Sequence, residues 1–171
     1  MNWEAVGAVG ESLGALGVIV SLVYLASQIR TQNRASRVSA ATEWTNQWNL
    51  FLGSFAEHSE LSEIWMKGTH DFSALNPAET VQLSSHLGRI FRVGENIYDQ
   101  HEQGLFDAKA WRGVERTLED ISRFPGTKAW WQTRRHWYSD EFVALVQPWI
   151  DSTEPQRMYP NLLPPPKREE D

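Results

Sequence analysis

The residues best suited to chemistry lie in one short run, ENIYDQHE, near the middle of the chain. In a helix the carboxylates of Glu95, Asp99 and Glu102 occupy positions i, i+4 and i+7 and so share one face, with Tyr98 and His101 beside them. Such a group can bind a metal ion or transfer protons. The alternative is the solvated end of a helix, where the helix dipole favours a cationic His101.

Motifs of well-known catalytic sites are missing from the sequence. There is no HExxH, no GxSxG, no glycine-rich phosphate loop and no Glu-x-x-His of the di-iron type. The chain has no cysteine, which excludes disulfides, thiolate zinc sites and cysteine nucleophiles. We therefore expect no cofactor and no metal, and we favour a non-enzymatic function, although the polar run leaves an enzyme open.

The N-terminal part of the chain has the pattern of an apolar helix. No charged residue occurs from Ser12 to Ile29, and at ~1.5 Å rise per residue this run is about 27 Å long, close to the ~30 Å hydrocarbon layer of a bilayer. The start, MNWEAVGAVGE, is acidic and lacks the basic region of a secretory signal. The sequence predicts a transmembrane anchor helix over 1–30, with a buried helix of a soluble protein as the alternative.

The charges that flank this run are asymmetric. Arg30, Arg34 and Arg37 follow it, and no lysine or arginine precedes it. By the positive-inside rule, a single-pass anchor with this pattern has its N-terminus outside and its C-terminal domain in the cytoplasm. The three arginines are also candidates for contact with lipid headgroups.

Small residues recur along the anchor with a spacing of three and four. The residues are Gly7, Gly10, Gly14, Gly17 and Ser21. They line one helix face and would let two backbones approach closely in a bilayer, which predicts a helix-packing interface with another copy or with a membrane protein partner. The alternative is the general enrichment of glycine in membrane helices.

The rest of the chain is predicted to be all-α. Apolar residues recur with helical spacing over 41–55, 60–67, 77–103 and 108–122, the last of these capped by Asp107. Two further helices are predicted after residue 122, one capped by Thr127 and one by Ser139. We expect a small cytoplasmic helical bundle over 31–153, in which Asn76-Pro77 starts one helix and Gly104 ends it. The segment 154–171 is rich in proline and is predicted to be extended or disordered.

The charge of the chain argues against nucleic acid as a partner. The formal net charge is −6 and the sequence pI is about 5.4, whereas nucleic-acid binding calls for a basic field. One basic cluster, TRRHW at 133–137, contains Arg134, Arg135 and His136. It is typical of a solvated helix face, and contact with anionic lipid or nucleic acid is the alternative.

Two stretches carry a resemblance to a known group of proteins. The anchor contains Tyr24, Leu25, Ala26 and then Gln28, Ile29 and Arg30, and the segment from Tyr98 to Val146 contains GLFD, FPG, WW and SDEF. Together they resemble uncharacterised bacterial single-span membrane proteins whose glycine-rich anchor ends in a YLAxQIR-like signature. The segment Gln32-Asn33-Arg34 departs from the Asn-Thr ending usual in that group. The resemblance implies a helical protein of the bacterial inner membrane and implies no activity.

Two functions are consistent with these patterns. The first is a non-enzymatic membrane-anchored protein that self-associates or serves as an accessory subunit of a larger inner-membrane complex, such as a respiratory or photosynthetic assembly. The second is a small membrane-tethered enzyme or ligand-binding domain with a pocket between helices near Glu95, Tyr98 and His101.

Overall fold

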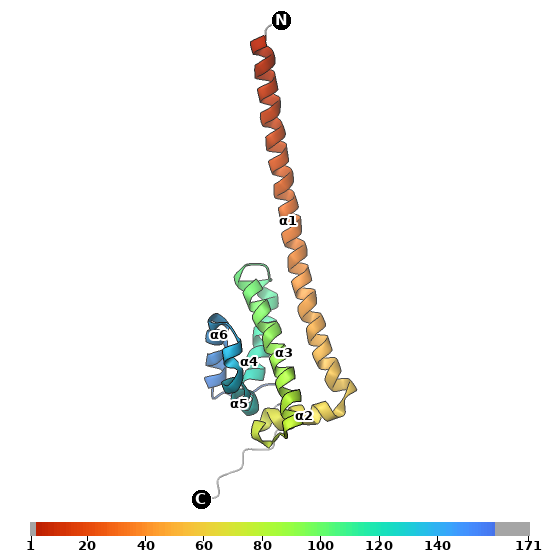
Figure 1. Ribbon diagram of the computed structural model, residues 1–171, viewed down its shortest axis with the longest axis vertical. Coiled ribbons are helices and arrows are strands. Elements are labelled where there is room, and N and C mark those ends of the chain that lie inside the picture. Colours follow the sequence, from red (N-terminus) through yellow and green to blue (C-terminus); the bar gives the residue numbers. More distant parts are fainter. Residues whose placement is uncertain (1–2, 160–171) are drawn as a thin grey trace, which may run out of the picture. The chain divides into compact units, whose positions relative to one another are not determined.

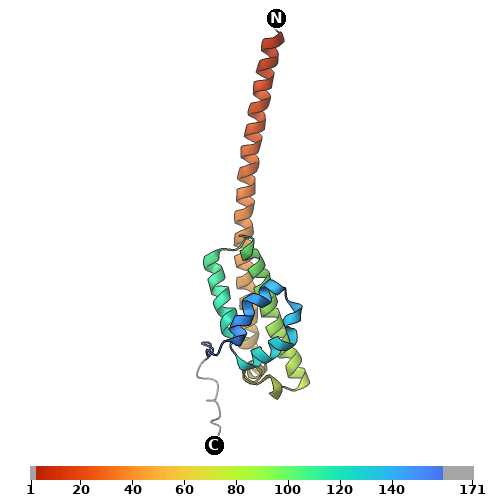
Figure 2. The ribbon, with the colours of Figure 1, turned by 90° about the vertical axis from the view of Figure 1, so that its left-hand side faces the viewer.

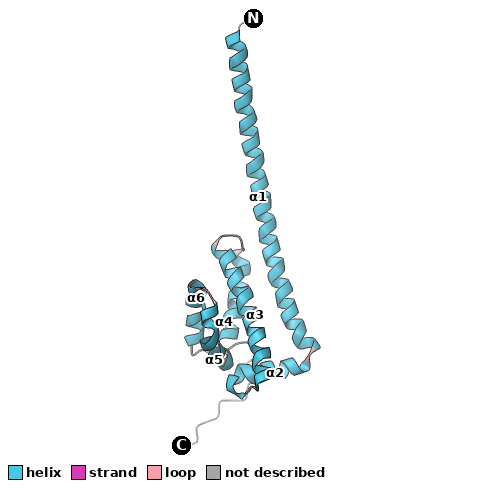
Figure 3. Ribbon diagram, viewed as in Figure 1, coloured by secondary structure: helices cyan, strands magenta, loops and turns pink. Residues whose placement is uncertain are grey.

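The computed structural model describes residues 3–159, apart from the side chains at 3–10, 12, 13, 15, 33, 34, 36, 37, 40 and 41. Every regular element in this range is a helix and no strand occurs, as the sequence predicts (Figures 1 and 3). The chain divides into two compact units, 1–39 and 40–171. One helix, α1 (Trp3–Glu57), starts in the first unit and ends in the second.

The first unit consists of the N-terminal part of α1. The side chains at 16–32 are exposed without exception. Within the described part of the chain, we find no helix that combines the length and the apolar character needed to cross a membrane. The predicted transmembrane helix over 1–30 is therefore not supported there. Residues 1 and 2 of this range, and the side chains at 3–10, 12, 13 and 15, are not described.

The second unit is a bundle built around one long helix. Its elements after α1 are α2 (Ser59–His70), η1 (Phe72–Ala74), α3 (Pro77–Glu102), α4 (Ala108–Ser122), α5 (Pro125–Arg134), η2 (Arg135–Trp137) and α6 (Asp140–Asp151). The central helix α3 packs against α2 and α4, α6 packs against α4, and α5 packs against α2 and η1 (Figure 2).

Local sequence signals set most of the helix ends. The side chain of Asn76 accepts a hydrogen bond from the N–H of Glu79, and the Glu79 carboxylate accepts one from the Asn76 N–H, forming a complete capping box. Asp107 and Ser139 cap α4 and α6 through their side-chain oxygens. At the end of α3, Gly104 has a φ of +70°, a conformation that glycine adopts without strain. These four predictions are confirmed.

The predicted cap at Thr127 is wrong. Helix α5 begins earlier, at Pro125, with Phe124 rather than Thr127 in the capping position and no side-chain cap. Proline suits the first helical position because its φ is already helical and it lacks an N–H that would go unbonded. Thr127 lies instead in the first turn, fully buried. Trp137 lies beyond the end of α5 and belongs to η2.

Aromatic side chains fill the core. Trp130 and Trp131 are completely buried, and the ring of Phe91 packs against both, at centroid distances of 5.4 and 5.3 Å. Near the C-terminal end of α3, Tyr98 contacts Trp111 and Phe142. Because buried aromatic side chains bury large apolar areas, these contacts account for much of the packing between α3, α4, α5 and α6.

The last described residues lie on the surface of this bundle. The N–H of Arg157 donates to a carboxylate oxygen of Asp120, and Glu154 pairs with Arg123 at 2.8 Å. Met158 packs against the core. The segment 152–159 is non-helical, and the rest of the predicted extended tail, 160–171, lies outside the described residues.

Two helices cross in very close contact at a pair of glycines. Gly68 near the end of α2 meets Gly126 in the first turn of α5, and a Cβ added to Gly126 would overlap the carbonyl oxygen of Gly68. A Cβ on Gly68 would in turn meet side-chain atoms of Leu83 and Leu75. No larger residue fits at Gly126 without separating α2 from α5.

We expect Gly126→Ala to lower the free energy of unfolding by about 2 kcal/mol or more, because the added methyl group must displace backbone rather than a side chain. Gly113 is the matched control: it is exposed in the middle of α4, and a Cβ there meets nothing within 4 Å. Gly113→Ala should raise the stability by about 0.5–1 kcal/mol through helix propensity. Urea unfolding of both variants measures this difference, and equal midpoints would contradict it.

Candidate functional site

The polar run singled out in the sequence is split between different environments. Glu95 is buried, Tyr98 and His101 are partly buried, and Asp99 and Glu102 are exposed. The ring of His101 stacks on Trp111 with a centroid distance of 5.4 Å. Within the described part of the chain no group of three or more histidine, aspartate or glutamate residues is arranged to hold a metal ion.

Glu95 and Arg92 together bind the backbone that connects η2 to α6. One carboxylate oxygen of Glu95 accepts the N–H of Ser139 at 2.7 Å, and the other pairs with the Arg92 guanidinium. Arg92 also donates to the carbonyl oxygen of Trp137 at 2.8 Å. We call these contacts the Arg92–Glu95 clasp. Its hydrogen bonds position Trp137 and the start of α6 relative to α3.

Desolvation, and after it neighbouring negative charge, raises the pKa of two residues of this run. Although the Asp99 side chain is exposed, the protein around it removes some of its hydration, and this desolvation, followed by the charges of Glu95 and Glu141, raises the pKa of Asp99 above its ordinary value. Burial and then the charges of Glu102, Glu141 and Asp99 raise the pKa of Tyr98. Both shifts favour the protonated forms.

The residues predicted to form the packing interface are only partly described. The structure does not describe the exposure of Gly7 and Gly10. Gly14 and Gly17 are exposed, and a Cβ added to Gly14 or to Gly17 would meet nothing within 4 Å. The Ser21 hydroxyl donates to the carbonyl oxygen of Gly17 at 2.8 Å.

Of the three arginines predicted to contact lipid headgroups, only Arg30 has a side chain that the structure describes. Arg30 is exposed, and the side chains of Arg34 and Arg37 lie outside the described set.

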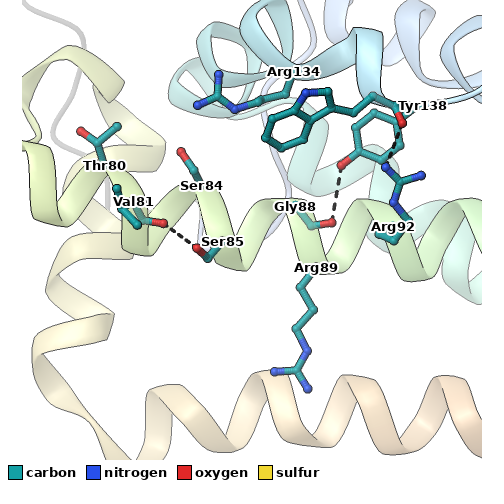
Figure 4. A pocket seen from close by; sticks show the side chains of 10 residues that line it. Thr80, Val81, Ser84, Ser85, Gly88, Arg89, Arg92, Arg134 and Tyr138 are labelled. Carbon is teal, nitrogen blue, oxygen red and sulfur yellow. Dashed lines mark hydrogen bonds between the residues drawn. The ribbon is translucent and has the colours of Figure 1, made fainter.

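A groove forms elsewhere, between α3 and η2. It has a volume of about 560 Å³, within the range typical of small-molecule sites. We call it the α3–η2 groove, and its lining residues are Thr80, Val81, Ser84, Ser85, Gly88, Arg89, Arg92, Arg134, Trp137 and Tyr138 (Figure 4). None of Glu95, Tyr98 and His101 lines it, so this groove is not the pocket expected from the sequence.

The arginines of the groove have different surroundings. The Arg92 guanidinium is held by the clasp and lies 4.7 Å from the ring centre of Tyr138. Arg89 extends from α3 away from the groove and donates to the side chain of Gln47 at 3.0 Å (Figure 4). Arg134 lies over the indole of Trp137, with 4.9 Å between the guanidinium carbon and the ring centre.

Tyr138 closes one end of the groove. Its hydroxyl donates to the carbonyl oxygen of Gly88 at 3.5 Å. Burial raises the pKa of Tyr138 to about 12, although the neighbouring charge of Arg92 acts in the opposite direction. The phenol is therefore neutral at physiological pH and serves as a hydrogen-bond donor and as an aromatic surface for Arg92.

Two polar atoms at the groove are buried without a hydrogen-bond partner. They are the hydroxyl oxygen of Ser84 and Nε of Arg134. The neighbouring hydroxyls of Thr80 and Ser85 donate to the carbonyl oxygens of Asn76 and Val81. Unpaired buried polar atoms are uncommon in folded proteins and call for an explanation.

Only some of the residues that line this groove can be recognised from the sequence. The cluster TRRHW is recognisable as a basic face, and Arg134 and Trp137 belong to it. Ser84 and Arg92 carry no such signal, because each is an ordinary polar residue of an amphipathic helix. Nothing in their spacing indicates that η2, more than forty positions later in the chain, packs beside them.

We expect Glu95→Gln to lower the free energy of unfolding by about 1–2 kcal/mol, because it removes the charge from the hydrogen bond to the Ser139 N–H and from the pair with Arg92, which itself binds η2. Glu102→Gln, an exposed change on the same helix, should leave stability nearly unchanged. Thermal or urea unfolding distinguishes the two. If both variants unfold alike, the clasp does not stabilise the bundle.

Comparison with known proteins identifies no relative. The chain matches no protein-family model, no curated protein and no solved structure. Its function must be inferred from its residues and their arrangement.

Proposed function

We propose that this protein is a non-enzymatic helical protein that the N-terminal part of α1 attaches to the bacterial inner membrane. In this proposal the second unit is cytoplasmic and the anchor packs against another copy or against a membrane protein, as in an accessory subunit of a larger complex. The observation that carries the proposal is the exposure of the apolar side chains at the start of α1.

These side chains are large, nearly consecutive and directed to all sides of the helix. Each is between 54% and 65% exposed, and the residues are Leu16, Val18, Ile19, Val20, Leu22, Val23, Tyr24, Leu25 and Ile29. Successive residues of a helix point about 100° apart, so no single apolar face exists that one neighbouring surface could cover. Surroundings that are apolar on every side, such as the interior of a bilayer, satisfy this arrangement.

The polar side chains within this segment bond to their own helix. Ser21 donates to Gly17 and Ser27 to Tyr24, in both cases to the carbonyl oxygen, and the Gln28 amide donates to the Tyr24 hydroxyl at 2.7 Å. Polar groups in lipid must find partners within the protein. These bonds reduce the cost of placing the segment in an apolar environment.

The basic residues after the segment support the proposed orientation. Arg30 follows the last apolar residue and is exposed, and Arg34 and Arg37 come next in the sequence. Cationic side chains at the end of an anchor favour the cytoplasmic side and can contact anionic headgroups. The second unit, which follows them in the chain, would then be cytoplasmic.

We expect Val20→Arg to release a large share of the protein from the membrane, because an arginine at the centre of an apolar anchor costs about 2.5–3.5 kcal/mol. Val81→Arg is the matched control, since Val81 on α3 is 66% exposed and Val20 is 65% exposed. Sedimentation of expressing-cell membranes after alkaline carbonate washing measures the bound fraction. Wild-type protein that remains in the supernatant would refute the attachment itself.

We also expect the anchor to associate through its small residues. Gly14→Leu combined with Gly17→Leu should weaken self-association in detergent, because the larger side chains keep two helices apart. Leu16→Ala with Val20→Ala, on other positions of the same helix, serves as the control. Sedimentation equilibrium reports the change, and a wild-type protein that is monomeric in detergent and in native membranes excludes self-association.

A further inference from the structure

We propose that the α3–η2 groove is a binding site for a small organic anion, in which a phosphate or carboxylate group is joined to an apolar body. This role is separate from the proposed membrane attachment and uses residues of the second unit alone. Four features of the groove support it: the charge of its lining, an unpaired hydroxyl, an exposed aromatic ring and its size.

The lining is positively charged. It contains three arginines and no carboxylate. Glu95 partly neutralises Arg92, and Arg89 points away from the groove. Arg134 donates only to the carbonyl and hydroxyl oxygens of the adjacent Thr133, and it has no carboxylate partner in the described part of the chain. Its guanidinium therefore remains available to an anion from solution.

The hydroxyl of Ser84 faces the same space. Figure 4 shows it on the side of α3 that is turned toward Arg134, and it has no hydrogen-bond partner. A hydroxyl that is buried without a partner costs free energy. An anionic oxygen of a ligand in the groove would accept a hydrogen bond from this hydroxyl and so supply the acceptor that the protein itself lacks.

An apolar surface adjoins this polar part. Trp137 is 52% exposed and Val81 is 66% exposed, both high values for large apolar side chains beside a groove. Because the Arg134 guanidinium lies over the indole, the cationic and the apolar surfaces are contiguous. A ligand that carries an anion next to an aromatic or aliphatic group matches both surfaces at once, whereas inorganic phosphate matches only one.

The dimensions favour a small molecule. The volume of about 560 Å³ exceeds what a free inorganic anion needs and lies in the range of drug-sized ligands. The clasp fixes the backbone of Trp137 to α3, so the groove is largely formed before a ligand arrives. Preformed sites bind more tightly because less conformational entropy is lost on binding.

Phenyl phosphate is a suitable probe because it combines the two features. Calorimetric titration of the full-length chain in a neutral detergent should show saturable binding at concentrations below about 10 mM. Inorganic phosphate and phenol, each with one of the two features, should bind at least about tenfold more weakly. The indole signal of Trp137, assigned by its loss in Trp137→Phe, should shift on titration in a proton–nitrogen correlation spectrum.

Two variants test the polar contacts. Arg134→Gln should weaken the binding of phenyl phosphate about tenfold or more, the usual loss for a charge-assisted hydrogen bond. Ser84→Ala should weaken it several-fold and should leave the fold intact, because the hydroxyl that it removes has no partner. Arg112→Gln, on the exposed face of α4, is the matched control and should bind like the wild type.

The opposite outcomes overturn the proposal. Absence of saturable binding to folded wild-type protein does so, as does phenyl phosphate that binds no more tightly than inorganic phosphate or phenol. Equal affinity of wild type, Arg134→Gln and Ser84→Ala would place the binding elsewhere. None of these results bears on membrane attachment, which is measured by sedimentation, so the two proposals fail or succeed separately.

Discussion

The close crossing of α2 and α5 governs how the bundle is assembled. Gly68 and Gly126 have no side chains, and the two backbones meet there directly. This contact brings the first turn of α5 against α2 and directs Trp130 and Trp131 into the core. The order of the remaining elements follows, since η2 and α6 continue the chain from the end of α5. A small pair of residues thus sets the position of a much larger aromatic core.

The Arg92–Glu95 clasp extends this order from the core to the surface. It joins α3 to the backbone of Trp137 and Ser139 through charge-assisted hydrogen bonds. The same arginine contributes to the α3–η2 groove, so stability and the shape of the groove depend on shared residues. Glu95 is a candidate for chemistry by its spacing in the sequence, but its two carboxylate oxygens are occupied by the guanidinium and the Ser139 N–H. A carboxylate so engaged is poorly placed to bind a metal ion as well.

The two units use apolar residues in opposite ways. In the second unit large apolar side chains of α3 and α5 such as Leu87 and Trp131 are fully buried, although Val81 of α3 is exposed. In the first unit the described apolar side chains between Leu16 and Ile29 are exposed on all sides of α1. Exposed apolar surface of this extent is unfavourable in water. That contrast motivates the proposal that lipid and a partner helix surround the start of α1.

The helical architecture and most helix ends can be predicted from the residues alone, because capping and periodicity act over a few positions. Asn76, Asp107 and Ser139 are identifiable as caps in this way. Thr127 is not, because a buried threonine and a capping threonine look alike in sequence, and only packing against α2 distinguishes them. The clasp and the groove depend on tertiary structure, since Glu95 and Ser139 are 44 residues apart. Contacts between residues so far apart in the chain depend on how the helices pack against one another. They cannot be predicted from the residue pattern of a single helix.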